Sequence, residues 1–228
     1  MYGYYGYGFD YLIYILPGLL LALYAQAKIN SAYSKYLRVD SNTGLTGRDV
    51  ARRILDRNGL NNVEINRING KLTDNFNPET NALYLSDDVY NRSSVASLAI
   101  AAHEVGHAIQ HASGYTPIKI RAALVPAANI GSQTSMFLIM LGLFFSSFFL
   151  KVGIALFAIT VLFQIVTLPV EFDASRRAQK ELAQGILNTE DLKGSKKVLG
   201  AAALTYIAST IVAIGQLLRL LSLSRRRD

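Results

Sequence analysis

Four long apolar stretches constrain the fold of this chain more than any other feature of its sequence. They cover about residues 9–27, 123–148, 152–170 and 198–221, and each comes close to or exceeds the ~20 residues that a helix needs to cross a bilayer. A segment in lipid must pair its own backbone N–H and C=O groups, as a helix does. We therefore expect a mainly α fold of multi-pass membrane helices in the cell membrane, with the lipid bilayer as a partner and a small α+β domain.

The first and fourth stretches each allow a second interpretation. The first could be a cleaved signal peptide, but Met1–Phe9 contains no Lys or Arg and no small-residue cleavage site closes the stretch. An uncleaved anchor is therefore expected. The fourth stretch contains the polar residues Thr205, Tyr206 and Gln216, so it either spans the membrane or packs against the other helices.

Positive charge predicts the orientation of these helices, because short loops rich in Lys and Arg stay in the cytoplasm. The turn between the second and third stretches carries only Lys151. Residues 171–197 and, two crossings away, 28–121 are therefore expected on the cytoplasmic side. The tail Arg225–Arg227 conflicts with this topology if the fourth stretch spans. The basic residues of 171–197 are Arg176, Arg177, Lys180, Lys193, Lys196 and Lys197.

The segment after the first stretch is expected to form a short helix and then a small sheet. Thr46 can cap the helix, Asp49 falls at its third position as in a capping box, and Asn58-Gly59 can end it. The Asn69-Gly70 pair is a strong hairpin signal between the first two strands. The strands are expected at about residues 63–66, 71–76 and 81–86.

The motif His103-Glu104-Val105-Gly106-His107 follows this predicted sheet. A helix over it is expected to begin at Ser93 or Ser94 and to stop at Ser113-Gly114. Histidines four apart share one helix face, so both imidazoles can hold one zinc ion with Glu104 beside them as a base. Such a motif also occurs by chance, but the predicted helix favours a zinc site. Gly106 costs roughly 1 kcal/mol of helix propensity and lets another backbone come close.

A catalytic zinc ion usually has three protein ligands and a water, so a third ligand is needed. His111 lies two turns beyond His103, about 12 Å away at about 1.5 Å per residue, which is too far on one straight helix. Glu171 and Asp173 are alternatives from a later helix, and their spacing points them to different sides. Both could instead be interfacial charges paired with the two arginines that follow.

Several segments of the chain resemble those of a known family. The segments H-E-V-G-H-A-I-Q-H and L-P-V-E-F-D-A-S-R-R-A, which flank a membrane hairpin, are similar to the bacterial neutral zinc metallopeptidases called YugP-like. So are L-P-G-L-L-L-A-L-Y-A-Q and the L-T-G-x-x-V-A-R-R-I-L segment, and the resemblance covers nearly the whole chain. The family in turn resembles the HtpX and CaaX-prenyl-protease group of membrane gluzincins.

This resemblance implies a gluzincin-like catalytic domain with Glu171 as the third zinc ligand. The wider group has an aspartate where this chain has Ser175, so Ser175 or Asp173 is expected to orient a histidine ligand by a hydrogen bond. The segment Asn81-Ala82-Leu83-Tyr84 resembles the active-site edge strand of gluzincins. Such a strand would bind the substrate backbone by strand addition.

The resulting expectation is a membrane-embedded, zinc-dependent endopeptidase with one zinc ion, cutting protein substrates near the membrane surface. Glu104 would take a proton from the attacking water and return it to the leaving amine. The sequence does not rank the donors that could stabilise the oxyanion. The candidates are His111, Tyr84, Tyr206, Arg176 and Arg177.

Two other functions are less consistent with the sequence. A catalytically inactive zinc-binding membrane scaffold has no use for the base Glu104. A zinc transporter would need ionisable residues in its membrane stretches, and the second and third have none. The net charge of +7 agrees with the positive-inside pattern, so no nucleic-acid partner is expected. The chain has no cysteine, which excludes disulfides and thiolate ligands. The oligomeric state is not determined by the sequence.

These expectations divide the chain into five parts. They are an N-terminal membrane anchor (1–28), a soluble catalytic subdomain with the zinc-binding helix (29–121), a membrane hairpin (122–170), a loop or helix with the third zinc ligand (171–197), and a C-terminal membrane helix with a basic tail (198–228).

Overall fold

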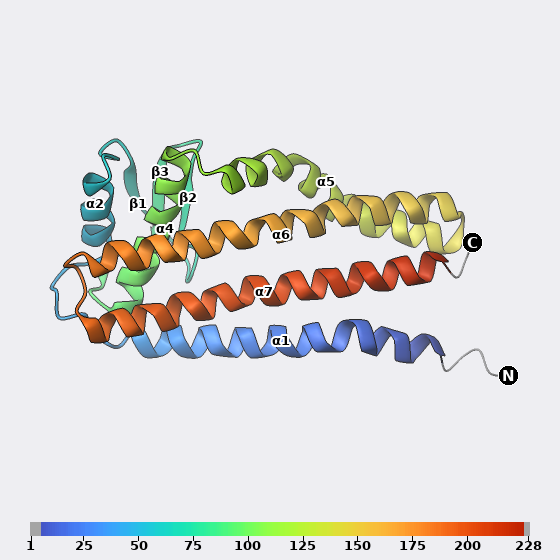
Figure 1. The fold of residues 1–228 in the computed structure, drawn as a ribbon, viewed down its shortest axis with the longest axis horizontal. Helices are drawn as coiled ribbons and strands as arrows, with labels where there is room; N and C mark the ends of the chain where they lie inside the picture. The colour runs from blue at the N-terminus through green and yellow to red at the C-terminus, as the bar shows by residue number, and fades with distance from the viewer. Residues whose placement is uncertain (1–5, 226–228) are drawn as a thin grey trace. The chain divides into compact units, whose positions relative to one another are not determined.

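A computed structural model describes residues 6–225 of the chain, with side chains from residue 13 onward. The fold is mainly α with one small sheet, as predicted (Figure 1). The elements are α1 (Gly6–Tyr36), α2 (Gly47–Arg57), β1 (Glu64–Ile68), β2 (Asn75–Asn77), β3 (Ala82–Ser86), α3 (Asp87–Asn91), α4 (Val95–Ala112), α5 (Thr116–Phe144), α6 (Ser147–Ala183) and α7 (Thr189–Arg225).

The four longest helices, α1, α5, α6 and α7, correspond to the four apolar stretches, and each is long and apolar enough to cross a membrane. The second stretch, expected to end at about 148, ends earlier, because α5 stops at Phe144 and α6 begins at Ser147. The fourth stretch, which contains several polar residues, is as long and apolar as a membrane span requires, with a mean hydropathy of 1.9. Two of these helices extend well beyond lipid-compatible sequence. α6 continues through Pro169 to Ala183 and α7 begins at Thr189, so most of the segment 171–197 is helix and its loop is short.

The chain forms two compact units, and every long helix contributes residues to both. One unit comprises residues 1–26, 119–168 and 204–228, and the other comprises 27–118 and 169–203. The second unit contains the sheet, α2 to α4, the C-terminal parts of α1 and α6, the first residues of α5 and the N-terminal part of α7. Nearly all of 28–121 and all of 171–197, which are predicted to share one side of the membrane, therefore belong to one unit.

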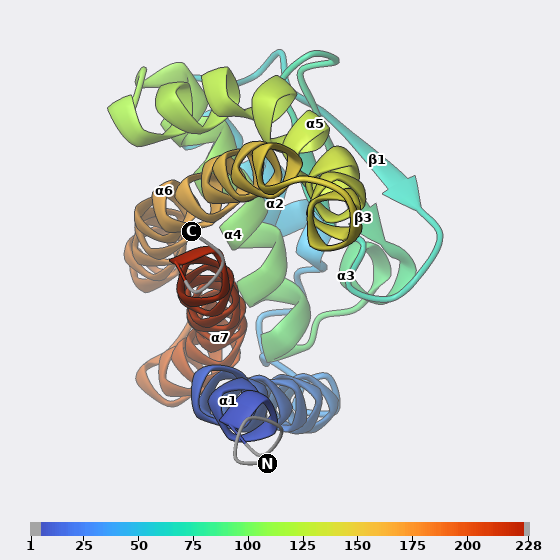
Figure 2. The same ribbon diagram turned by 90° about the vertical axis from the view of Figure 1, so that its right-hand side faces the viewer.

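Glycines bring the long helices of the first unit close together. A Cβ atom at Gly142 of α5 would lie 2.3 Å from the Leu150 nitrogen of α6. A Cβ atom at Gly18 of α1 would lie 3.0 Å from a methyl carbon of Val212 in α7, and both views show α1 and α7 side by side (Figures 1 and 2). In lipid such small residues permit the close van der Waals contact on which helix association depends.

The three-stranded sheet of the second unit has the order β1-β3-β2. β3 runs parallel to β1 and antiparallel to β2. The strand expected at 71–76 is shorter and pairs with β3 rather than β1, so the hairpin expected at Asn69-Gly70 is wrong. The reason is burial, because four of the five residues of β3 are buried whereas β1 and β2 are half exposed. The most apolar strand therefore takes the centre.

The helices of the second unit begin and end where their caps predict. Thr46 and Asp49 form a reciprocal capping box at the start of α2. The Ser94 side chain caps α4 by accepting from the Ser97 N–H, and Ser113 and Gly114 follow its last residue. The apolar faces of α2 and α4 pack with β3 into one core. Its fully buried members include Val50, Ile54, Leu55, Leu83, Leu85, Leu98 and Val105.

Candidate metal centre

Helix α4 presents two histidines and a glutamate at one place. The rings of His103 and His107 meet edge to face with their centroids 4.8 Å apart, as expected for residues one turn apart. Glu104 is the next residue after His103, and only 8% of it is exposed. Because a charged side chain is seldom buried without a partner, these three polar residues, close together on a largely apolar helix, mark a site rather than core packing.

Helix α6 supplies the third member of the group. Glu171 is 4% exposed, and its Oε2 lies 3.3 Å from His103 Nε2 and 3.6 Å from His107 Nε2. These separations are longer than those of a good hydrogen bond. Donor atoms about 2.0–2.1 Å from a tetrahedral zinc ion lie about 3.3 Å apart. The nitrogen and oxygen atoms of His103, His107 and Glu171 could therefore hold one metal ion.

Gly106, between the two histidines, allows α6 to come this close. A Cβ atom there would lie 2.6 Å from the carbonyl oxygen of Ala174 and 3.1 Å from its Cα. No side chain can shift to relieve such a contact, because the neighbouring atoms belong to backbone. The close approach of another backbone that was expected at this glycine is therefore confirmed. It brings α6 against the face of α4 that carries the histidines.

The second ring nitrogen of each histidine, Nδ1, also has a partner. The Ser175 hydroxyl lies 3.1 Å from His103 Nδ1, and the Gln110 amide oxygen lies 3.0 Å from His107 Nδ1. These contacts turn both Nε2 atoms toward Glu171. A metal-binding histidine needs such a partner, because it fixes the ring orientation and the nitrogen that carries the proton.

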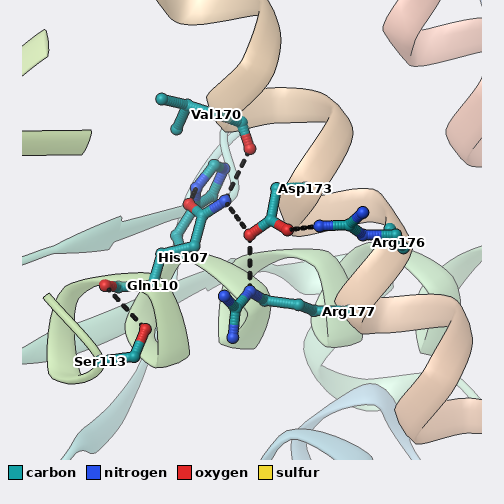
Figure 3. Close-up of polar contacts among 7 residues, drawn as sticks. All are labelled: His107, Gln110, Ser113, Val170, Asp173, Arg176 and Arg177. Atoms are coloured by element: carbon teal, nitrogen blue, oxygen red, sulfur yellow. Dashed lines mark hydrogen bonds and ion pairs between the residues drawn. The ribbon is translucent and has the colours of Figure 1, made fainter. Parts of the chain in front are cut away.

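Asp173 points away from this group, as its two-residue spacing from Glu171 predicts. Its side chain is 3% exposed and accepts hydrogen bonds from Gln110, Arg176 and Arg177 (Figure 3). The interpretation of both carboxylates as charges paired with the two following arginines therefore holds for Asp173, which contacts both, whereas Glu171 lies against the two histidines.

The chain matches over residues 11–225 the protein family described as "Putative neutral zinc metallopeptidase". The chain belongs to this family. It is also 39% identical over 211 residues to the "Putative membrane protease YugP" of Bacillus subtilis (strain 168), a match that covers 92% of this chain and 94% of that protein. No solved structure gave a significant match to the chain. Together with its four long apolar helices, these matches identify a membrane protein of a zinc peptidase family.

The residues expected to bind substrate as an edge strand lie elsewhere in the sheet. Ala82, Leu83 and Tyr84 belong to β3, and Asn81 precedes it. β3 is the central strand, paired with β1 on one side and β2 on the other, so neither side is open for strand addition. The segment is therefore not the edge strand that the resemblance implied, because β1 and β2 pair with it on its two sides. The edge beside α4 is β2, whose Phe76 ring lies 6.0 Å from the His111 ring.

The residues expected as oxyanion donors are scattered. His111 is exposed on α4 and is not part of the three-residue group found among the described residues. The Tyr84 hydroxyl lies 3.3 Å from the Thr80 hydroxyl, and Tyr206 belongs to the other unit. Arg176 and Arg177 bind Asp173, and Arg177 also lies over the Tyr115 ring.

Two functional candidates were missed in the sequence. Gln110 is completely buried beside His107, and its position three residues after a ligand on an apolar helix was the available signal. Asp74 accepts hydrogen bonds from the Ser86 N–H at 2.7 Å and from the Ser86 hydroxyl. Nothing in its local sequence indicated that its side chain is partly buried.

Burial and neighbouring charges together shift the pKa values of His107 and Asp74. Burial lowers the pKa of the His107 imidazole, but hydrogen bonding and charge from Glu171 and the charge of Glu104 raise it by more, so the net shift is upward. The carboxylates thus favour a positive charge at the histidines, whether a proton or a metal ion supplies it. Burial raises the pKa of Asp74 to about 6 against the opposing hydrogen bonds from Ser86, and the Glu104 charge adds to the rise.

We expect Gly106→Ala to weaken metal binding. The added methyl group must push α6 away from α4, which costs about 1–3 kcal/mol of unfolding free energy and raises the Kd for zinc about tenfold or more. Chelator competition and thermal unfolding in detergent measure both effects. Gly200→Ala is the control, because a Cβ atom there meets nothing within 4 Å. Equal zinc affinity in the two variants would contradict the proposed role of the contact.

Asp74 should make stability fall as pH rises. Its folded pKa of about 6 lies above its ordinary value of 3.8, so its contribution is fully present below pH 3.8 and is lost as pH rises through 6. Relative to Asp74→Asn, the wild type should lose up to about 3 kcal/mol of unfolding free energy across this window, at about 1.4 kcal/mol per pKa unit. Denaturant titrations from pH 4 to about 8 measure the difference. A difference that stays constant with pH contradicts the burial argument.

Proposed function

We propose that this protein is a zinc-dependent endopeptidase whose metal ligands are His103, His107 and Glu171. The observation that carries the proposal is the spacing of the three donor atoms, 3.3 and 3.6 Å from carboxylate to imidazoles, next to the buried carboxylate of Glu104. One zinc ion held there would lower the pKa of a bound water and polarise a peptide carbonyl.

Glu104 acts as general base and then as general acid. Its position directly after His103 places its carboxylate beside the ligand group, where it takes a proton from the attacking water and returns it to the leaving amine. Its burial removes bulk water that would compete for that proton. The two histidines are held by their hydrogen bonds to Ser175 and Gln110, so their rings need no rearrangement.

Glu104→Gln and Glu171→Ala separate chemistry from metal binding. Glu104→Gln should keep about one zinc ion per chain and lose at least about a hundredfold in peptide cleavage, because a general base contributes roughly 10²–10⁴-fold. Glu171→Ala should lose both peptide cleavage and the zinc ion. Metal analysis and cleavage of casein and of detergent-solubilised membrane proteins provide the measurements.

Each outcome of this experiment has a distinct meaning. Zinc in the wild type and in Glu104→Gln, without cleavage by either, would favour the inactive scaffold. Undiminished cleavage by Glu104→Gln would remove Glu104 from the mechanism.

We also propose that substrates are membrane proteins or segments close to the membrane, because α6 carries both a candidate span and Glu171. Equal turnover of soluble and membrane substrates would contradict this part.

We propose further that the unit with the metal ligands faces the cytoplasm. The basic residues of 171–197 belong to this unit, whereas the turn after α5 has little positive charge. The chain lacks cysteine, so single cysteines report sidedness directly. In intact cells an impermeant maleimide should label Ser146→Cys in the turn between α5 and α6, and should label Lys196→Cys only after permeabilisation. The reverse pattern would invert the topology.

A further inference from the structure

Gln110 is the most completely buried polar side chain in contact with the metal centre. It lies on α4 three residues after His107 and has no exposed surface. Its Nε2 donates to the Val170 carbonyl oxygen at 2.7 Å and to Asp173 Oδ2 at 3.0 Å, while its Oε1 lies 3.0 Å from His107 Nδ1 (Figure 3). One amide thus connects the histidine to two groups of α6.

These partners leave the Gln110 amide one orientation. A carbonyl and a carboxylate can only accept hydrogen bonds, so the –NH2 end must face Val170 and Asp173. The amide oxygen then faces His107, and it too can only accept. When the ring is neutral, or when Nε2 binds a metal ion, the 3.0 Å contact to Gln110 therefore places the single imidazole proton on Nδ1.

Asp173 keeps this arrangement from reversing. Its side chain is almost fully buried and is paired with the guanidinium groups of Arg176 and Arg177, the latter through Nε at 2.6 Å. Two adjacent cations favour the ionised carboxylate, which offers no donor. The Gln110 amide cannot turn over without placing its oxygen against this anion and against the Val170 carbonyl.

The other histidine is held differently. The partner of His103 Nδ1 is the Ser175 hydroxyl, and a hydroxyl can donate or accept as it rotates. Ser175 therefore orients the His103 ring without selecting its tautomer. The two imidazoles of the motif differ in this respect, although their sequence positions look equivalent.

We propose that Gln110 is a positioning residue that locks His107 in its Nδ1-protonated tautomer and so preorganises Nε2 for the metal. The inference rests on the proposed zinc site but concerns an arrangement of this chain's own residues. Partners of this kind typically change metal affinity by about 10–100-fold. The role belongs to Gln110 itself, with Asp173 and Val170 setting the direction of its amide.

The test combines zinc affinity with nitrogen NMR of the histidines. The chain contains only three histidines, and His111→Gln removes the exposed one from the spectrum. In chelator-treated protein at alkaline pH, where the imidazoles are neutral, His107 should be in the Nδ1–H form. Gln110→Met, similar in size but without an acceptor oxygen, should give a mixture of tautomers and raise the zinc Kd about 10–100-fold.

Two further variants separate positioning from structural support. Gln110→Glu keeps an acceptor for His107 but loses the donors to Val170 and Asp173, so it should retain the tautomer and bind zinc at least about tenfold more tightly than Gln110→Met, while being less stable than the wild type. Gln179→Met removes a glutamine that bonds Ser195 in the same unit, and it should leave both readouts unchanged.

The proposal is overturned if Gln110→Met keeps the wild-type tautomer, or if the Met and Glu variants bind zinc equally. Failure of the proposed function would look different. A wild-type protein that binds zinc without cleaving peptides, or that binds no zinc, would leave the tautomer result in the chelated protein as an independent measurement of the role of Gln110.

Discussion

The close contact between α4 and α6 at Gly106 and Ala174 is the constraint on which the metal centre depends. Neither helix alone carries a complete set of ligands, and more than sixty positions of sequence separate His107 from Glu171. A glycine between the histidines removes the one Cβ atom that would hold the backbones apart. The roughly 1 kcal/mol of helix propensity lost at a glycine is offset by the burial and the contacts that the approach permits.

The face of α6 that meets α4 combines several partners in a short run of sequence. Glu171 lies near the Nε2 atoms of both histidines, and the Ser175 hydroxyl lies near Nδ1 of His103. The Val170 carbonyl and Asp173 accept hydrogen bonds from the Gln110 amide. Helical periodicity separates these functions, because residues two apart point to different sides. One helix thereby supports the donor group and both of its orienting hydrogen bonds.

Three carboxylates around this contact have different partners. Asp173 has two arginines, Glu171 has two imidazoles, and Asp74 has the N–H and hydroxyl of Ser86. The partners of Asp74 are neutral and its side chain is partly buried, which fits the rise of its pKa to about 6. The sheet contributes position rather than chemistry, since its buried central strand β3 packs in the same core as α4 and its edge strand β2 reaches His111.

Local patterns in the sequence were enough to predict the four apolar helices, the capped helices α2 and α4, and the pairing of His103 with His107 on one face, because these depend on residues a few positions apart. The sequence alone left Glu171 and Asp173 as alternatives, and it misplaced β3 at the edge of the sheet and missed Gln110 and Asp74. Those features depend on contacts between distant segments. Whether a carboxylate meets a histidine or an arginine, and whether a strand has one neighbour or two, is decided only when α6 packs against α4 and β1 and β2 pair with β3.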